Sequence, residues 1–152
     1  MIAYELSIAV QKRFGFCPET RFVSGCRPPQ QFTSDHAETL SDADVVRIVR
    51  NLGGTEAQIL EDEEMLQLVL PALRGDFLMY LNYELTHDTI LECDLVVLGG
   101  QQDNMAPPQS LPGWELRTSA STCFHSFPGG HFFVRDETAS VIASVTAELA
   151  IR

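Results

Sequence analysis

The chain of 152 residues contains no apolar run close to the ~20 residues that a membrane-spanning helix needs. Its opening segment, MIAYELSIAVQKRF, is apolar first and basic later, which is the reverse of a secretory signal. Basic residues are also scarce, since 10 Lys and Arg stand against 21 Asp and Glu, for a formal net charge of −11. This balance disfavours nucleic acid and anionic membranes as partners, because both bind basic surfaces. It is compatible with a small-molecule substrate or a basic partner.

The four cysteines form no CxxC pair, and no histidine lies near one of them at a spacing typical of a zinc site. Internal repeats and low-complexity tracts are absent as well. We therefore expect free thiols in a reducing cytoplasm. These thiols are Cys17, Cys26, Cys93 and Cys123.

The order of the apolar patterns predicts strands that alternate with helices, which indicates an α/β fold with a parallel sheet. DLVVLGG, residues 94–100, is typical of a strand that such a sheet buries on both faces. Ser41 and Asp44 have the spacing of a helix-capping box, and Pro71 should kink or split the helix around it. The predicted helices cover residues 2–14, 41–52, 56–60, 62–84, a stretch around 111–118, and 136–151 with Asp136 as cap; the predicted strands cover 20–25, 94–100 and 122–127.

Three strands are few for a parallel sheet that is covered on both faces. The helix at 2–14 also begins inside its own apolar pattern, without a capping residue before it. Both features favour the C-terminal part of a larger α/β domain.

An acid and a histidine follow the carboxyl ends of two predicted strands. Asp103 lies in a loop rich in Gly and Pro after the strand that begins at 94, and His131 follows the strand at 122–127. Ligands and catalytic groups of open α/β sheets collect at this edge. Asp before His is also the order of the second and third members of the Ser, Asp and His triad of α/β-hydrolases. In that triad the acid orients the imidazole, and the imidazole takes the serine proton.

Gly129 and Gly130 permit a sharp turn that brings His131 back over the sheet edge, where Phe132 and Phe133 can pack beneath it. An ordinary interpretation stays open, because aspartates suit turns and loop histidines are often surface residues.

The remaining candidates have weaker settings. Ser24 precedes a glycine at a strand end, but FVSGC lacks the first glycine of the G-x-S-x-G elbow and no helix follows. The other histidines, His36, His87 and His125, are interpreted as surface or structural residues. Trp114 is expected in the core.

Six segments carry a family resemblance: FVSGCRPP (22–29), LSDADVVRIVRNLGGT (40–55), LVLPALRGDFLMYLNYE (68–84), LVVLGGQQD (95–103), the tryptophan at 114, and FPGGHFFV (127–134). Together they resemble type II thioesterases, the α/β-hydrolases that accompany nonribosomal peptide and polyketide synthases in antibiotic biosynthesis. LPALRGDF and FPGGHFF are more specific to that family than to the fold, and the resemblance runs over nearly the whole chain.

The resemblance implies a cytoplasmic enzyme that removes acyl groups from the phosphopantetheine arm of an acyl or peptidyl carrier protein, without a metal or organic cofactor. It implies that Asp103 is the triad acid and His131 the triad base. It also implies a helical lid at about 41–84, whose apolar residues line an acyl pocket or pack the lid. The candidates for substrate binding are Leu70, Leu73 and Phe77, together with Leu66 and Leu81.

In the family, the nucleophilic serine belongs to a GHSMG-type elbow directly before the helix that corresponds to residues 2–14. We therefore expect residues 1–152 to form a single truncated domain that lacks this serine and is inactive or nearly so by itself. A non-catalytic module that binds acyl groups or carrier proteins is the alternative. A hydrolase that uses Cys26 or Ser24 is a third interpretation. Asp94, where relatives usually carry proline, is a small departure.

Overall fold

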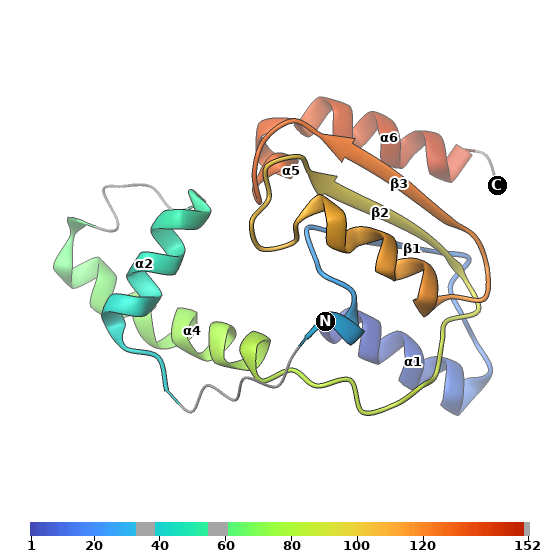
Figure 1. The fold of residues 1–152 in the computed structure, drawn as a ribbon, viewed down its shortest axis with the longest axis horizontal. Helices are drawn as coiled ribbons and strands as arrows, with labels where there is room; N and C mark the ends of the chain where they lie inside the picture. The colour runs from blue at the N-terminus through green and yellow to red at the C-terminus, as the bar shows by residue number, and fades with distance from the viewer. Residues whose placement is uncertain (33–38, 55–60, 151–152) are drawn as a thin grey trace. The chain divides into compact units, whose positions relative to one another are not determined.

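The computed structural model describes residues 1–32, 39–54 and 61–150, and its ribbon is drawn in Figure 1. The chain divides into two compact units: unit 1 comprises Met1–Gln31 and Leu85–Arg152, and unit 2 comprises Phe32–Glu84. The helix predicted at 56–60 lies outside the described residues. No helix in the described ranges has the length and apolar character needed to cross a bilayer.

Unit 1 is built on a parallel sheet with strand order β1-β2-β3, which confirms the predicted α/β class. Strand β2 is central and buried along almost its whole length. The strands are β1 (Thr20–Ser24), β2 (Asp94–Gly100) and β3 (Thr122–Phe127). The helices of this unit are α1 (Ile2–Phe14), η1 (Pro29–Gln31), η2 (Pro108–Arg117), α5 (Phe133–Asp136) and α6 (Thr138–Ala150).

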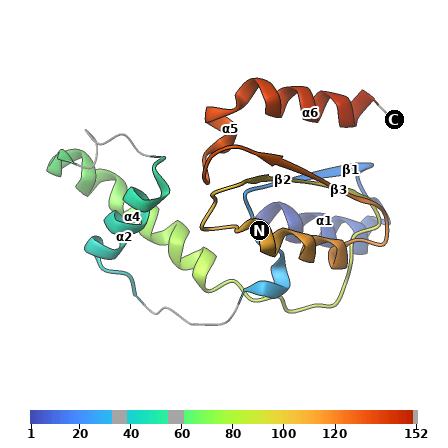
Figure 2. The ribbon, with the colours of Figure 1, turned by 45° about the horizontal axis from the view of Figure 1, so that its top comes forward.

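Helices cover both faces of the sheet. Successive side chains of β2 point to opposite faces, and those on each face pack against helices. Leu95 and Val97 pack in one cluster with residues of α1 and η2. Val96 and Leu98 pack in a second cluster with residues of α5 and α6. Figure 2 shows this layering, with α6 on one side of the strands and α1 and η2 on the other. The strand β2 is therefore buried on both faces, as its continuous apolar sequence predicts.

Trp114 is the largest buried side chain, with 1% of its surface exposed. Its indole Nε1–H donates to the carbonyl oxygen of Cys26 at 2.8 Å, and its ring meets the ring of Tyr4 edge-on at 5.7 Å between centroids. Because the indole donor is satisfied, the ring is buried without leaving an unpaired polar group. The predicted core role of Trp114 is confirmed.

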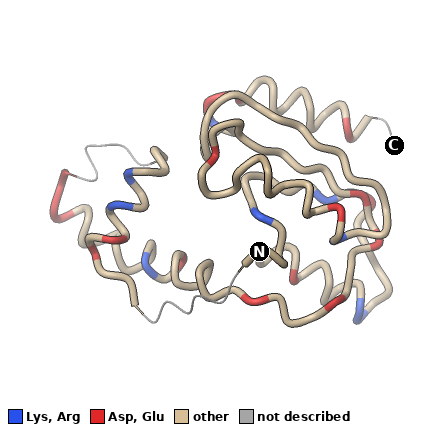
Figure 3. Tube along the Cα trace, viewed as in Figure 1, with Lys and Arg blue, Asp and Glu red and all other residues tan. Residues whose placement is uncertain are grey.

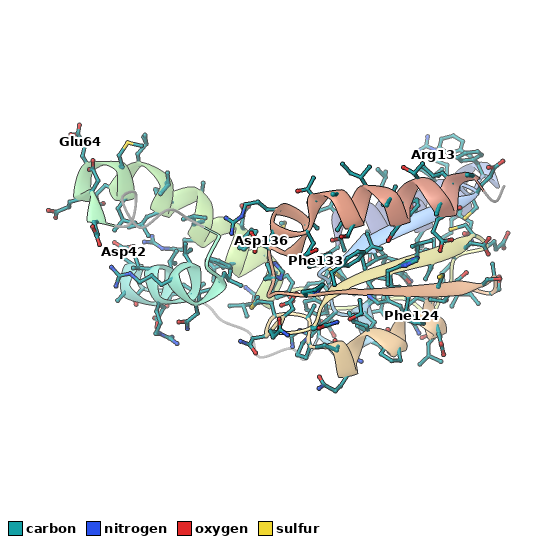
Figure 4. The ribbon with its side chains drawn as sticks, turned by 90° about the horizontal axis from the view of Figure 1, so that it is seen from above. Arg13, Asp42, Glu64, Phe124, Phe133 and Asp136 are labelled. Atoms are coloured by element: carbon teal, nitrogen blue, oxygen red, sulfur yellow. The ribbon has the colours of Figure 1, made fainter. Side chains whose placement is uncertain are left out.

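The chain makes a separate turn between β3 and the last helix, so the prediction that Asp136 caps this helix is wrong. Asp136 ends the short helix α5, and α6 begins at Thr138. Phe133 explains the extra turn: its side chain is fully buried and its ring stacks on Phe127 at 5.4 Å. Burying this ring holds α5 against the sheet before α6 begins. Figure 4 shows Phe133 on the side of the sheet that α6 covers and Phe124 on the other side.

In the described part of unit 2, two helices pack against each other: α2 (Asp42–Leu52) and α4 (Glu63–Leu81). Its buried centre consists of Val45, Val49 and Leu70. The predicted cap of α2 is confirmed, because Ser41 Oγ accepts from the backbone N–H of Asp44 at 3.2 Å and donates to its carboxylate at 2.6 Å. Helix α4 continues through Pro71, so the predicted split does not occur. Apolar residues on both sides of Pro71 pack in the same cluster, which offsets the backbone hydrogen bond that the proline removes.

Charged residues occur in both units (Figure 3). Apart from the neighbours Lys12 and Arg13, the few basic positions are separated along the trace by acidic and uncharged stretches, as the net charge of −11 leads one to expect. The described part of the chain therefore has no continuous basic stretch of the kind that nucleic acid binds.

Candidate active site

Asp103 and His131 are in direct contact, as their positions after adjacent strands predict. Nδ1 of His131 lies 2.9 Å from Oδ2 of Asp103. The other carboxylate oxygen, Oδ1, accepts the backbone N–H groups of Met105 at 2.8 Å and Ala106 at 3.0 Å. The side chain of Asp103 is completely buried. Since the backbone holds one oxygen in place, the second oxygen is fixed as an acceptor for the imidazole.

The loops after β2 and β3 are tied to each other, and this positions His131. The backbone N–H of Gly129 donates to Oε1 of Gln102 at 2.7 Å, and the backbone N–H of Gln102 donates to the carbonyl of Gly129 at 2.9 Å. Gly129 has a φ of +97°, a conformation that favours glycine. The predicted turn before His131 is therefore present, and hydrogen bonds from the neighbouring loop hold it.

The aromatic residues after His131 behave differently from each other. Phe133 is buried beneath the loop, as predicted. Phe132 is only half-buried, and its ring lies edge-on to the imidazole at 5.4 Å between centroids. Phe132 therefore contacts the candidate base directly.

Gly25 directly follows β1, and it brings the end of this strand close to Asp103 and His131. Its backbone N–H donates to the carbonyl of Leu98 at 3.0 Å. A Cβ on Gly25 would lie 3.5 Å from Nδ1 of His131 and 3.6 Å from Oδ2 of Asp103. This contact was not predicted from the sequence, although a glycine directly after a strand end is a signal for close backbone approach. The carboxyl ends of all three strands thus converge on the pair of side chains.

The hydrogen bond to Asp103 determines which imidazole nitrogen can act as a base. A carboxylate is an acceptor, so in the neutral imidazole the proton belongs on Nδ1, and Nε2 keeps its lone pair. The side chain of His131 is 29% exposed, so this nitrogen is within reach of a substrate or nucleophile. Among the described residues, Nε2 has no hydrogen-bond partner. The pair can therefore accept a proton at Nε2 and stabilise the resulting imidazolium.

The other candidates are placed elsewhere. Nε2 of His87 lies 3.0 Å from a carboxylate oxygen of Glu5, and Nε2 of His125 lies 2.8 Å from one of Glu148. His36 lies outside the described residues. Burial raises the pKa of the Cys26 thiol, so a reactive thiolate is not favoured there. Ser24 is exposed at the end of β1.

The predicted substrate-binding residues all belong to unit 2. Leu70 is buried between α2 and α4, and Leu73 and Phe77 are partly buried in the same cluster. Leu66 and Leu70 also line a hollow between these two helices. The packing of α2 against α4 explains why these residues are buried. Their contact with a substrate stays a prediction.

Known proteins show similarity over almost the entire chain. The family model described as Thioesterase domain matches residues 1–149. The chain is 31% identical over 150 residues to Thioesterase PikA5 of Streptomyces venezuelae, covering 99% of this chain and 53% of that protein. It is 30% identical over 152 residues to the gramicidin S biosynthesis protein GrsT of Aneurinibacillus migulanus, covering 99% of this chain and 59% of that protein.

A solved structure shows the same similarity in three dimensions. The type II thioesterase BorB from the borrelidin biosynthetic cluster superposes with a TM-score of 0.82 at 28% identity, covering 97% of this chain and 60% of that one. The chain spans a little more than half the length of these two curated relatives. The match to the family, the parallel sheet and the relatives agree: this chain belongs to the thioesterase domain family, and its fold is of the α/β-hydrolase type.

Proposed function

We propose that this domain hydrolyses acyl thioesters with His131 as general base and Asp103 as the residue that orients it. The observation that carries the proposal is the hydrogen bond of 2.9 Å between their side chains, with Asp103 buried and its second oxygen held by two backbone N–H groups. This arrangement matches what base catalysis of acyl transfer requires: a fixed tautomer, an accessible Nε2 and a nearby negative charge for the imidazolium.

The proposed reaction has two steps. Nε2 of His131 takes the proton of a serine hydroxyl while the serine oxygen attacks the thioester carbonyl, and the thiol leaves with a proton. The acyl-serine is then hydrolysed by a water that His131 deprotonates, which releases the carboxylic acid and returns the serine. Backbone N–H groups that bind the oxyanion would contribute about 3–4 kcal/mol for each donor.

The serine is the part of this proposal that the described residues do not supply. None of their hydroxyl or thiol groups forms a hydrogen bond with Nε2 of His131. We therefore assign the nucleophile to an elbow that precedes α1 in the complete enzyme, as the family resemblance implies. Residues 1–152 alone should then hydrolyse thioesters on the order of 10⁶ times more slowly, because a lost nucleophile has an effect of this size in serine hydrolases.

The proposed substrate is an acyl or peptidyl group on the phosphopantetheine arm of a carrier protein. One relative is named for gramicidin S biosynthesis, and another comes from the borrelidin biosynthetic cluster. The proposal assigns α2 and α4 to a lid whose apolar residues hold the acyl chain. Leu70, Leu73 and Phe77 of α4 are its candidates, because they are the apolar residues of this helix that the family resemblance assigns to the lid.

The test compares this chain with a version extended upstream to include an in-frame G-H-S-x-G. Both proteins are assayed on an acyl-carrier-protein thioester, with His131→Gln and His87→Gln as matched variants. His87 is the control because it also pairs with a carboxylate, at 3.0 Å, but its partner is Glu5 and not Asp103. We expect hydrolysis by the extended protein, loss of at least 10³-fold in His131→Gln, and normal rates in His87→Gln.

An extended protein whose hydrolysis is unaffected by His131→Gln would overturn the proposed base. A stop codon close upstream of codon 1, with carrier binding and no hydrolysis by the chain, would instead support the non-catalytic binding module. Normal hydrolysis by residues 1–152 alone would point to another nucleophile, and Ser24→Ala and Cys26→Ala would then identify it.

A further inference from the structure

Three side chains whose atoms can coordinate a metal ion meet in unit 1, outside the pair of Asp103 and His131. Nε2 of His125 lies 2.8 Å from Oε1 of Glu148. The sulfur of Cys123 lies 3.2 Å from the same oxygen and 3.6 Å from Nε2 of His125. In the described part of the chain, this is the only group of three His, Cys, Asp or Glu side chains whose ligand atoms converge in this way.

The strand geometry explains why these side chains share one face. Cys123 and His125 are alternate residues of β3, so they point to the same side of the sheet. They pair in parallel register with Val96 and Leu98, whose side chains pack with residues of α5 and α6. Helix α6 then places Glu148 opposite the strand. The side chains of His125 and Glu148 are 27% and 15% exposed, so an ion can reach them.

The set of donor atoms matches the preference of zinc. Thiolate, imidazole and carboxylate bind zinc at about 2.3, 2.0 and 2.0 Å respectively. In a tetrahedral site, these lengths place sulfur and nitrogen about 3.5 Å apart and nitrogen and oxygen about 3.3 Å apart. The observed separations of 3.6 Å and 2.8 Å are within a small side-chain adjustment of these values. Magnesium and calcium prefer oxygen ligands, so the sulfur and nitrogen select against them.

We propose that Cys123, His125 and Glu148 bind one zinc ion, with water as the fourth ligand. Binding replaces the proton of the Cys123 thiol by the metal, so one proton is released for each ion bound. The ion joins strand β3 to the C-terminal half of α6. It lies toward the start of β3, whereas His131 follows the end of that strand. The site therefore stabilises the fold and takes no part in the proposed hydrolysis.

The first experiment titrates the purified chain with Co²⁺ and then displaces the cobalt with Zn²⁺. We expect one cobalt ion per chain, a thiolate-to-cobalt absorption band in the near ultraviolet, and loss of this band as zinc binds. Cys123→Ser should lose the band, and His125→Gln and Glu148→Gln should weaken zinc binding on the order of tenfold or more. The controls are His87→Gln, a histidine with a carboxylate partner but no thiol, and Cys17→Ser, and both should bind as wild type does.

A second measurement needs no variant and therefore does not depend on how well a variant folds. Each thiol of the wild-type chain is alkylated with iodoacetamide, with and without zinc, and quantified by mass spectrometry. We expect zinc to protect Cys123 selectively and to leave the alkylation of Cys26 unchanged. The absence of a thiolate-to-cobalt band, or equal zinc affinity of wild type and Cys123→Ser, would overturn the proposal, as would alkylation of Cys123 at the same rate with and without zinc.

Discussion

Gly100 and Gly130 approach each other so closely that no side chain fits between them. A Cβ on Gly100 would lie 2.3 Å from the carbonyl oxygen of Gly130 and 2.8 Å from that of Gly129. Gly100 is the last residue of β2, and Gly130 directly precedes His131. The strand that leads to Asp103 is therefore in backbone contact with the loop that carries the histidine, and this contact requires glycine.

Gly100→Ala should displace the loop at 129–131 and weaken the hydrogen bond between His131 and Asp103. Overpacking of this kind costs about 1–3 kcal/mol in the free energy of unfolding. Urea denaturation of the chain measures this cost, and the imidazole ¹⁵N signals of His131 report the loss of its partner. Gly75→Ala is the control, because nothing lies within 4 Å of a Cβ there and its φ is not positive. An unchanged His131 spectrum in Gly100→Ala would contradict the proposed tie between the loops.

Gly25 should respond in a graded way to the size of the introduced side chain. Its φ of +54° makes any L-residue costly, by about 1–2 kcal/mol. The Cβ of alanine would stand 3.4 Å from Cε1 of His131, which is ordinary contact, whereas the branches of valine would reach into the imidazole. Gly25→Ala should therefore lower stability and keep the hydrogen bond to Asp103, and Gly25→Val should break it.

Gly15 provides the matched control for this prediction. Its φ is +61° and nothing lies within 4 Å of a Cβ at that position. Gly15→Val should have a similar cost in stability but leave the ¹⁵N signals of His131 unchanged. If both valine variants leave those signals unchanged, Gly25 does not contact the imidazole in solution.

Asp103→Asn should reverse the tautomer of His131. The asparagine oxygen can keep the two backbone N–H groups of Met105 and Ala106, so its NH₂ group would face Nδ1. Nδ1 must then accept, and the proton moves to Nε2, which can no longer act as a base. The rate of thioester hydrolysis by the extended protein should fall by about 10⁴-fold, as in other hydrolases with this triad. Imidazole ¹⁵N spectra of the chain alone check the tautomer without an activity assay, and a proton that stays on Nδ1 would contradict the argument.

The contact between Asp103 and His131 could be predicted from sequence because it depends on topology. Parallel strands end at one edge, so residues that follow adjacent strands come together whatever the details of packing. The cap at Ser41 was also predictable, because a cap depends on local spacing. The prediction that Asp136 caps the last helix was wrong because the burial of Phe133, a long-range contact, decides where that helix begins.

The meeting of Cys123, His125 and Glu148 depends on how α6 docks on the sheet. The cysteine and histidine are two residues apart, a spacing that brings side chains together only in a strand. The glutamate comes from a helix whose rotation on the sheet the sequence does not determine. Zinc-site spacings that are recognised in sequences come from loops and turns, so this arrangement was missed.

The buried thiol of Cys93 should make the unfolding free energy depend on pH in the alkaline range. Burial, assisted by the hydrogen bond to the Cys17 thiol, raises the pKa of Cys93 to about 12. In the unfolded chain, a thiol titrates near pH ~8.5. Above that pH the unfolded state loses a proton that the folded state keeps, so stability falls as pH rises, by up to about 1.4 kcal/mol per pH unit. This stability is fully present below pH ~8.5 and is lost toward the folded pKa.

Urea denaturation of wild type and Cys93→Ala at about pH 7.5, 9 and 10 tests this dependence. The variant loses packing at every pH, which lowers its free energy of unfolding. It also loses the titrating thiol, so the difference in unfolding free energy between wild type and variant (the deficit) should shrink as pH rises. Val141→Ala is the control, because Val141 is buried against the other face of the sheet and does not titrate. Its deficit should be the same at all three pH values. A Cys93→Ala deficit that stays as constant as that of the control would mean that the thiol ionises in the folded state as readily as in the unfolded chain.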